Sequence, residues 1–203
     1  MRFIKLSLLA FCLFALSGCP RVSEAQQNSN GANQSPKLRI IAEKFAYPVG
    51  KGEALTQAKD KKDEWYNALD FGANNHLGED WNRNSGGNTD CGENVFAIAD
   101  GSIVFAENAG AGWGNVVIVE HRLADGTRLQ SLYGHLQKIL KTSGEVKLRE
   151  QIGEIGNADG KYLCHLHFEI RAENCPMWNQ PGGGYSAERK GWLDPSDFID
   201  KRL

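Results

Sequence analysis

The sequence lacks most features of a membrane-spanning or nucleic-acid-binding protein. Lys and Arg number 23 and Asp and Glu number 25, so the formal net charge is −2 and gives no electrostatic case for a nucleic-acid partner. No apolar run after Leu16 is long enough for a transmembrane helix, and internal repeats and heptads are missing. Apolar residues make up 41% of the chain, which predicts a single domain with appendages.

The marked apolar run lies at the N-terminus. After a short basic start, residues 6–16 are apolar, too short to span a bilayer, and typical of a secretory signal. The run ends in LSGC, which resembles the bacterial lipobox, in which the cysteine is lipidated. We therefore expect a lipoprotein signal peptide over residues 1–18 and a lipid on Cys19 that contacts the membrane. The alternative is ordinary cleavage at SEA before Gln26, which would release a soluble protein.

The stretch after the signal is poor in large apolar residues. Residues 19–37 are rich in Gln, Asn and Ser, so we expect a flexible tether, and a folded domain over 38–203. An exported chain faces an oxidising compartment. We expect it to be lipid-anchored in the cell envelope, facing the periplasm, on the outer membrane.

The folded part shows strand patterns and few helical ones. Asp-Gly pairs at 100–101 and 125–126 separate apolar runs, which is a strong hairpin signal. Residues 145–157 indicate a shorter strand pair, and helical turns are expected only near 54–67 and 195–199. The sequence therefore predicts a mostly antiparallel β domain.

Two connecting loops are rich in glycine. They read NAGAGWG at 108–114 and NQPGGGY at 179–185. Because binding residues often lie on loops held by a rigid scaffold, these loops are candidate rims of a groove.

Two short segments carry side chains that bind metals. CHLHFEIR, at 164–171, alternates polar and apolar residues, which places His165 and His167 on one face of a strand. NNHLGEDWN, at 74–82, offers His76 and Asp80, whose even spacing also puts both on one strand face. Taken alone, each pair of residues more often has a structural role than a metal-binding one. The occurrence of both pairs in one β domain favours metal binding.

A catalytic zinc site needs three protein ligands and one open position. His76, Asp80 and one of the strand histidines would supply nitrogen and oxygen ligands, a set that favours zinc. His135, in YGHL, follows an apolar strand and sits where a loop would begin, and the histidines that do not bind the metal could act beside it.

The motifs resemble those of the lysostaphin/LytM-like zinc metallopeptidases. HLGED is similar to their H-x-G-x-D motif, and CHLHFEIR to their H-x-H strand. VFAIADGSIVFA, GWGNVVIVEH, LYGHL and IGEIGN follow in the same order, so the likeness covers about residues 70–172. It implies a mostly β fold, the antiparallel β-sheet groove of the duplicated hybrid motif type, with few short helices.

The resemblance also implies a set of site residues. It implies Zn²⁺ ligands at His76, Asp80 and His167. It implies catalytic roles for His135 and His165, either of which could be the general base.

Three further polar residues lie close to these motifs in the sequence or share their residue type. The strand alternation places Glu79 off the metal face. Glu169 lies on the histidine face, where it could orient a ligand. His121 matches no metal motif, so we expect a structural role for it.

The resemblance implies a zinc metalloendopeptidase that hydrolyses peptidoglycan stem peptides through a metal-activated water, and we expect a monomer. In a cell with an outer membrane, the implied substrate is the D,D cross-link. The alternative is a non-enzymatic LytM-domain lipoprotein that binds peptidoglycan and activates other wall hydrolases. The intact ligand positions favour the enzyme. A third interpretation, a binding module with structural zinc, would need a fourth ligand, and only Cys164 is near.

Three cysteines follow the tether, so at least one thiol is unpaired. The histidine strand separates Cys164 from Cys175 by some 20 Å or more, beyond the reach of a disulfide unless the chain folds back. If the strands that leave the metal at Asp80 and His167 run the same way, Cys91 and Cys175 meet at the far end. This predicts a Cys91–Cys175 disulfide and a free Cys164 beside the site.

Overall fold

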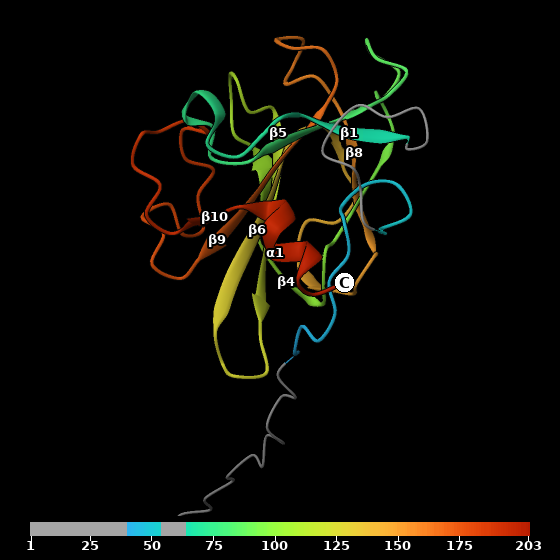
Figure 1. Cartoon of the computed structure of the whole chain (residues 1–203). Helices are drawn as coiled ribbons and strands as arrows, with labels where there is room; N and C mark the ends of the chain where they lie inside the picture. The colour runs from blue at the N-terminus through green and yellow to red at the C-terminus, as the bar shows by residue number, and fades with distance from the viewer. Residues whose placement is uncertain (1–39, 54–63) are drawn as a thin grey trace, which may run out of the picture. The chain divides into compact units, whose positions relative to one another are not determined.

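Ten strands form a single sheet in which every pairing is antiparallel (Figure 1). The structure is a computed structural model that describes residues 40–53 and 64–203. In chain order the elements are β1 (Trp65–Leu69), the 3-10 turn η1 (Ala73–Asn75), β2 (Glu79–Arg83), β3 (Asn94–Phe96), β4 (Gly101–Asn108), β5 (Asn115–Arg122), β6 (Arg128–Ile139), β7 (Gly144–Val146), β8 (Gln151–Ile155), β9 (Leu166–Ala172), β10 (Trp192–Leu193) and α1 (Pro195–Asp200). The predicted mostly antiparallel β class is confirmed.

The strand order brings distant motifs together. The main path runs β1-β2-β9-β6-β5-β4-β7, so β2, β9 and β6 are neighbours although they lie far apart in the sequence. In this register Asp80 faces His167 across one pair and Gly134 faces His167 across the next. The sheet therefore aligns the H-x-G-x-D segment, the H-x-H strand and the strand that leads to His135.

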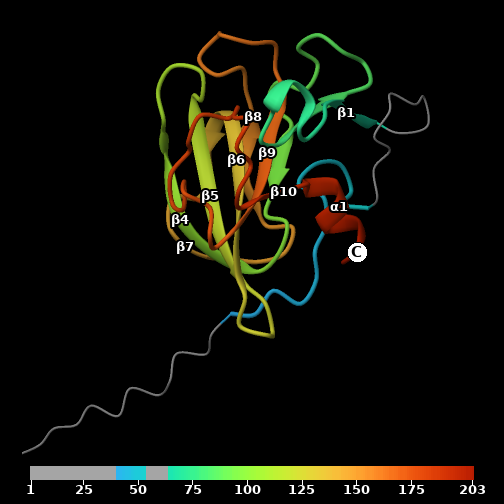
Figure 2. The ribbon, with the colours of Figure 1, turned by 60° about the vertical axis from the view of Figure 1, so that its left-hand side comes forward.

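The core follows from strands that are apolar on both faces. Val116, Val117, Ile118 and Val119 of β5 are all fully buried. Val117 and Val119 join the main cluster, whereas Val116 and Ile118 pack with Trp113 on the other face. A continuous apolar run of this kind is typical of a central strand, and β5 lies inside the sheet in both ribbon views (Figure 2).

The C-terminal helix and residues 40–53 brace one side of the sheet. Tyr47 donates a hydrogen bond to Asp200 at 2.8 Å, and the rings of Phe45 and Phe198 pack edge to face. Asp194 caps α1 by accepting the Asp197 N–H, and Pro195 begins the helix. The predicted helical turn near 195–199 is confirmed, whereas residues 65–67 are strand and residues 54–63 lie outside the described residues.

Local turn signals predicted strand pairing only in part. The hairpin at Asp125-Gly126 is confirmed, because β5 pairs with β6 and Gly126 has φ 89°. The prediction of a hairpin at Asp100-Gly101 is wrong, because β3 pairs with β8, whereas β4 pairs with β5 and β7. Gly101 is instead needed for close packing, since an added Cβ would lie 2.5 Å from the Glu120 carbonyl oxygen.

The strand pair predicted over 145–157 is also wrong. Both segments are strands, but β7 pairs with β4, and β8 pairs with β3 and β6. Pairing between strands distant in sequence here overrides the short turn that joins β7 and β8.

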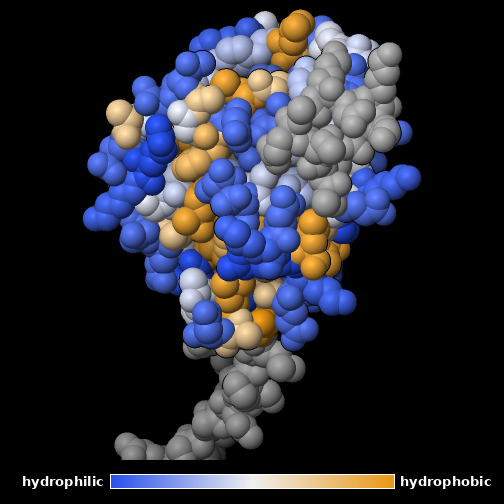
Figure 3. All heavy atoms as spheres, in the orientation of Figure 1, coloured by the Kyte–Doolittle hydropathy of each residue, from blue (hydrophilic) through white to orange (hydrophobic). Residues whose placement is uncertain are grey.

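One face of the surface, shown in Figure 3, mixes many hydrophilic residues with small hydrophobic groups. Within 40–53 and 64–203, no helix is long and apolar enough to cross a membrane. The predicted signal peptide, Cys19 and the tether lie outside the described residues.

Candidate metal centre and active site

Three predicted ligands converge at the junction of β2 and β9. Asp80 lies on β2 and His167 lies opposite it on β9. His76 is not part of β2, as the even spacing suggested, but follows η1 and bridges to Tyr185. The ligand atoms of His76, Asp80 and His167 all lie within 4.8 Å of one another.

Gly78 allows this convergence. A Cβ at this position would lie 2.3 Å from the Phe168 carbonyl oxygen, so only glycine lets the chain pass so close to β9. The glycine thus turns the chain between His76 and Asp80 and brings both toward His167. Its role explains the middle residue of the H-x-G-x-D motif in this chain.

The three converging atoms form a nearly regular triangle. His76 Nε2 lies 3.0 Å from His167 Nδ1 and 3.3 Å from Asp80 Oδ1, and His167 Nδ1 lies 3.1 Å from Asp80 Oδ1. Ligand bonds of about 2.0–2.2 Å place two ligand atoms of a tetrahedral zinc site about 3.3–3.5 Å apart. The triangle is close to that spacing.

Glu169 determines which nitrogen of His167 is available. The Glu169 carboxylate accepts a hydrogen bond from His167 Nε2 at 2.9 Å. The Nδ1 of a neutral His167 therefore carries a lone pair that points toward Asp80 and His76. This arrangement matches the expectation that Glu169 lies on the histidine face and orients a histidine.

The electrostatics of the triangle favour a cation. Burial would raise the pKa of Asp80, but hydrogen bonds from His167 and His76 hold it well below its usual range. Burial would lower the pKa of His167, but Asp80 and Glu169 outweigh it and raise the pKa to about 9. The same two carboxylates that attract a proton would attract a divalent metal, which competes with protons for such ligands.

The two other predicted histidines lie beside this triangle. The rings of His135 and His165 are 4.7 Å apart, and His165 Nε2 lies 3.7 Å from Asp80 Oδ1. Carbonyl oxygens of Trp113 and Leu163 accept hydrogen bonds from the Nδ1 atoms of His135 and His165. With Nδ1 as the donor, the lone pair of an imidazole lies on Nε2 in both residues.

His135 has two unusual properties. It adopts a left-handed backbone conformation with φ 63°, which is uncommon for a residue other than glycine. Burial, together with the neighbouring His167 and His165, lowers the pKa of His135 to about 3, so the ring is neutral near pH 7. A strained backbone and a shifted pKa in one residue are frequent at functional sites.

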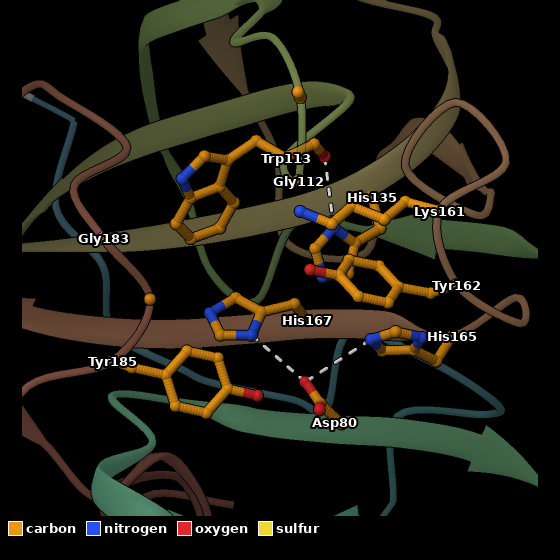
Figure 4. Close-up of a pocket in the computed structure, with 12 residues that line it drawn as sticks. Asp80, Gly112, Trp113, His135, Lys161, Tyr162, His165, His167, Gly183 and Tyr185 are labelled. Carbon is orange, nitrogen blue, oxygen red and sulfur yellow. Dashed lines mark hydrogen bonds and ion pairs between the residues drawn. The ribbon is translucent and has the colours of Figure 1, made fainter.

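A pocket of about 250 Å³ opens over these residues (Figure 4). Its walls come from three loops and contain Gly112, Trp113, Lys161, Tyr162 and Tyr185, as well as neighbouring glycines. The loops at 108–114 and 179–185, expected as rims of a groove, both line it. The third wall, formed by Lys161 and Tyr162, was missed because nothing in its sequence pattern marks it.

Two glutamates occupy the positions that strand alternation predicts. Glu79 is fully buried away from the triangle, where Ser196 and Trp81 donate hydrogen bonds to it, and burial raises its pKa to about 8. Glu169 also accepts hydrogen bonds from Trp192 and Arg171 on its second oxygen. Glu79 thus anchors the start of α1, whereas Glu169 supports the site.

His121 lies away from the pocket and is fully buried. Its Nδ1 lies 2.9 Å from the Asp100 carbonyl oxygen and its Nε2 lies 2.8 Å from Ser131 Oγ. Both nitrogens are thus engaged within the sheet, in agreement with the structural role expected for this residue.

The predicted Cys91–Cys175 disulfide is wrong. The structure contains a Cys91–Cys164 disulfide with a Cα–Cα distance of 5.2 Å, and Cys175 is free and buried. The error lies in the strand directions. Because β2 and β9 are antiparallel, the chain that leaves β2 meets the chain that enters β9, which places Cys91 beside Cys164. Cys164 is therefore not a free thiol beside the site.

The donor set fits a catalytic zinc site better than a structural one. Two imidazole nitrogens and one carboxylate oxygen converge at zinc-like spacing. Cys164, the fourth ligand that the sequence suggested for a structural site, forms a disulfide with Cys91. Three protein ligands with one position left for water are typical of catalytic zinc.

The match to a known family agrees with this geometry. The model of peptidase family M23 matches residues 74–179, which hold all five predicted metal and catalytic residues. The chain belongs to peptidase family M23.

Curated relatives have names of different kinds. The chain is 34% identical over 87 residues to the "Lipoprotein NlpD/LppB homolog" of Pseudomonas aeruginosa, covering 42% of this chain and 28% of that protein. It is 37% identical over 86 residues to "DD-carboxypeptidase/endopeptidase Mpg" of Neisseria meningitidis, covering 42% and 19%. It is 37% identical over 91 residues to "Murein hydrolase activator EnvC" of Escherichia coli, covering 44% and 20%. The chain thus spans less than a third of the length of these relatives.

Among solved structures, the solution structure of lysostaphin matches with 26% identity and a TM-score of 0.46, covering 63% of this chain and 44% of that one.

Proposed function

We propose that this member of family M23 is a zinc-dependent endopeptidase that cleaves peptide cross-links of bacterial peptidoglycan. The observation that carries the proposal is the convergence of five residues at one site, where four of them line the pocket and His76 is buried beside Asp80 and His167. His76, Asp80 and His167 form the triangle, and His135 and His165 present free Nε2 atoms beside it. An inactive scaffold has no need to keep all five.

Each group has a distinct task in this proposal. His76, Asp80 and His167 would hold Zn²⁺, which when bound activates a water molecule and polarises the scissile carbonyl. One of the two free histidines takes the proton of the attacking water, and one of them gives a proton to the leaving amine. His135 is neutral near pH 7, so its ring is unprotonated before the reaction.

The pocket walls would hold the peptide. Trp113 and Tyr185 pack their rings about the ligand histidines, with Trp113 5.0 Å from His167 and Tyr185 5.0 Å from His76, measured between centroids. Together with the glycine-rich loops they form the walls of an open pocket that carries both aromatic and charged side chains.

A second function has a specific observation in its favour. Relatives such as EnvC are named murein hydrolase activators, so this chain could bind peptidoglycan and activate another hydrolase. Another relative is named a DD-carboxypeptidase/endopeptidase, so the names of the relatives do not decide between the functions. The complete set of site residues favours the enzyme.

We further propose that the chain acts from the cell envelope, anchored through a lipid on Cys19. The lipobox-like LSGC supports this location. So does the similarity to a protein named as a lipoprotein.

Zinc content and hydrolysis of purified sacculi, measured on the same preparations, test the enzyme proposal. We expect one zinc per chain and release of soluble wall fragments. His76→Ala and Asp80→Asn should lose both, while Asp197→Asn, an exposed carboxylate change on α1, should lose neither. Zinc binding without hydrolysis, together with stimulation of a separate wall hydrolase, would instead support the activator.

A further inference from the structure

The wall of the pocket next to the free histidines carries an ammonium group. Lys161 and Tyr162 lie on the loop between β8 and β9 and line the pocket (Figure 4). The Tyr162 ring lies 5.1 Å from that of His135 and 5.8 Å from that of His165. Lys161 Nζ lies 5.6 Å from the centre of the same tyrosine ring. The Tyr162 ring therefore lies close to both histidines and to the ammonium.

Lys161 forms no ion pair within the part of the chain that the structure describes. Four other lysines do pair with carboxylates, namely Lys138, Lys141, Lys147 and Lys201. Asp159, two residues before Lys161, is engaged instead by Asn108 Nδ2 at 3.1 Å. The ammonium of Lys161 is thus available to an anion that enters the pocket.

The loop that carries Lys161 is fixed by several internal contacts. The Gly160 N–H donates to Asn157 Oδ1 at 2.9 Å, and the Tyr162 N–H donates to the Asn157 carbonyl oxygen at 3.1 Å. The Asn108–Asp159 contact joins this loop to the start of the loop at 108–114. These contacts therefore hold the backbone on both sides of Lys161 at the edge of the pocket.

The two ends of the pocket differ in charge. The end near His76 is closed by Tyr185 and carries no lysine or arginine among the residues that line the pocket. The end near His135 and His165 carries Lys161. A substrate with a carboxylate would therefore bind in one direction, with its anionic part beside the two histidines.

The expected proton transfer indicates which part of the substrate lies at the pocket end beside His135 and His165. If His135 or His165 gives a proton to the leaving amine, that amine lies at the same end of the pocket as Lys161. A carboxylate on the carbon that carries the amine would then be separated from the amine nitrogen by only that carbon and would come close to the lysine.

We propose that Lys161 binds a free carboxylate on the residue that supplies the leaving amine. The inference rests on the proposed peptidase function and specifies its substrate class. It selects peptides in which the cut amide is followed by an α-carboxylate and disfavours bonds inside an uncharged chain such as polyglycine. Such a carboxylate occurs at a D,D cross-link and also at a free C-terminus, so both sources share the chemistry.

Three synthetic peptides on a stem-peptide scaffold test the proposal. The first is a cross-linked dimer with a free carboxylate beside the cut amide, the second is its carboxamide, and the third is a stem peptide ending in a free carboxylate. We expect the zinc-loaded wild type to cleave the first with a kcat/KM about five- to tenfold higher than the second, the scale of a charge-assisted contact. Cleavage of the third peptide would show that a C-terminal carboxylate can also occupy the Lys161 site.

Variants assign the preference to the lysine. Lys161→Met should abolish the preference for carboxylate over carboxamide with zinc content unchanged, and Lys161→Arg should preserve it. Lys190→Met, an exposed lysine outside the pocket, should behave like wild type. Equal cleavage of the first two peptides by wild type, or an unchanged preference in Lys161→Met, would overturn the proposal.

A binding measurement separates this inference from the proposed activity. In the zinc-loaded His135→Ala background, calorimetry should show five- to tenfold tighter binding of the carboxylate dimer than of the carboxamide, and loss of that difference in Lys161→Met. If wild type binds with this preference but cleaves nothing, the carboxylate site stands and the peptidase proposal fails. If neither dimer binds, the carboxylate site fails.

Discussion

His167 and Glu169 lie on the same face of β9, and the 2.9 Å contact between His167 Nε2 and Glu169 Oε1 fixes the orientation of the imidazole. Arg171 and Trp192 in turn hold the other oxygen of Glu169. A chain of buried polar contacts thus leads from β10 to the proposed metal ligand.

Removal of the Glu169 charge should weaken zinc binding. We expect Glu169→Gln to lower zinc affinity about tenfold to a hundredfold, as for other residues that orient a ligand. The matched control is Glu188→Gln, an exposed carboxylate outside the pocket, which should leave zinc affinity unchanged. Zinc titration against a competing chelator measures both, and circular dichroism confirms that each variant is folded. Equal affinities in wild type and a folded Glu169→Gln would contradict this role.

Substitution of His135 or His165 should affect turnover without loss of zinc, unlike substitution of a metal ligand. His135→Ala and His165→Ala should retain zinc, since the triangle is intact, but the histidine that transfers protons should lose about a hundredfold to ten-thousandfold in turnover when it is removed. Metal analysis and wall hydrolysis on the same samples check this. Stoichiometric loss of zinc in His135→Ala would show that His135 is a ligand.

The Cys91–Cys164 disulfide should support both stability and the site. It closes a sequence separation of 73 residues, for which chain entropy gives roughly 4 kcal/mol of stabilisation. Cys164 directly precedes His165, so we expect Cys91→Ala/Cys164→Ala to lower the melting temperature and the rate of wall hydrolysis. Cys175→Ala is the control, since that thiol is free. A double variant as stable and active as the control would refute the prediction.

Protonation of His121 should destabilise the fold in acid. Burial lowers the pKa of this neutral, fully buried ring to about 4, whereas the unfolded chain has a pKa near its ordinary value of about 6.5. The unfolded state therefore binds more protons below pH 6.5, and stability falls as pH decreases from there toward 4. The loss is roughly 3 kcal/mol over that range by linkage.

A variant isolates this contribution. His121→Asn should be less stable than wild type at pH 7, because hydrogen bonds to Asp100 and Ser131 are lost, but the difference should shrink toward pH 4. Urea unfolding midpoints at a series of pH values measure it. A difference that does not change with pH would show that His121 does not titrate in this way.

Lipidation should determine where the chain is found. Cys19→Ser should move the protein from the membrane fraction to the soluble fraction, because the predicted anchor is the lipid and not the short apolar run. Fractionation and mass spectrometry of the mature N-terminus check this. A wild-type N-terminus at Gln26 would support ordinary cleavage instead.

Much of the candidate site could be predicted because its signals are local. His76 and Asp80 lie four residues apart, and His165 and His167 lie two apart, so each pair falls within one short motif, although His76 lies outside β2 and not on the strand that its spacing suggested. The strand class is equally local, because alternation and apolar runs are properties of short segments. The metal assignment itself stays a prediction.

The wrong predictions concern features that depend on pairing between strands far apart in the sequence. Asp100-Gly101 has the composition of a hairpin, yet β3 finds its partner in β8, more than 50 residues later. The disulfide prediction failed because the sequence of neither β2 nor β9 shows that the two strands pair antiparallel. Lys161 was missed because its surroundings are assembled from three loops, and no single loop shows them.

The hydrogen bond from Trp113 Nε1 to the Gly182 carbonyl oxygen, 2.8 Å long, ties together two loops that are far apart in the sequence. Since these loops form facing walls over the ligands, a change in the length of one would shift the indole or remove its acceptor. Loop exchange between family members, in evolution or in engineering, should therefore succeed only when both walls are exchanged together. The two loops are therefore expected to vary together, although they are separate segments of the sequence.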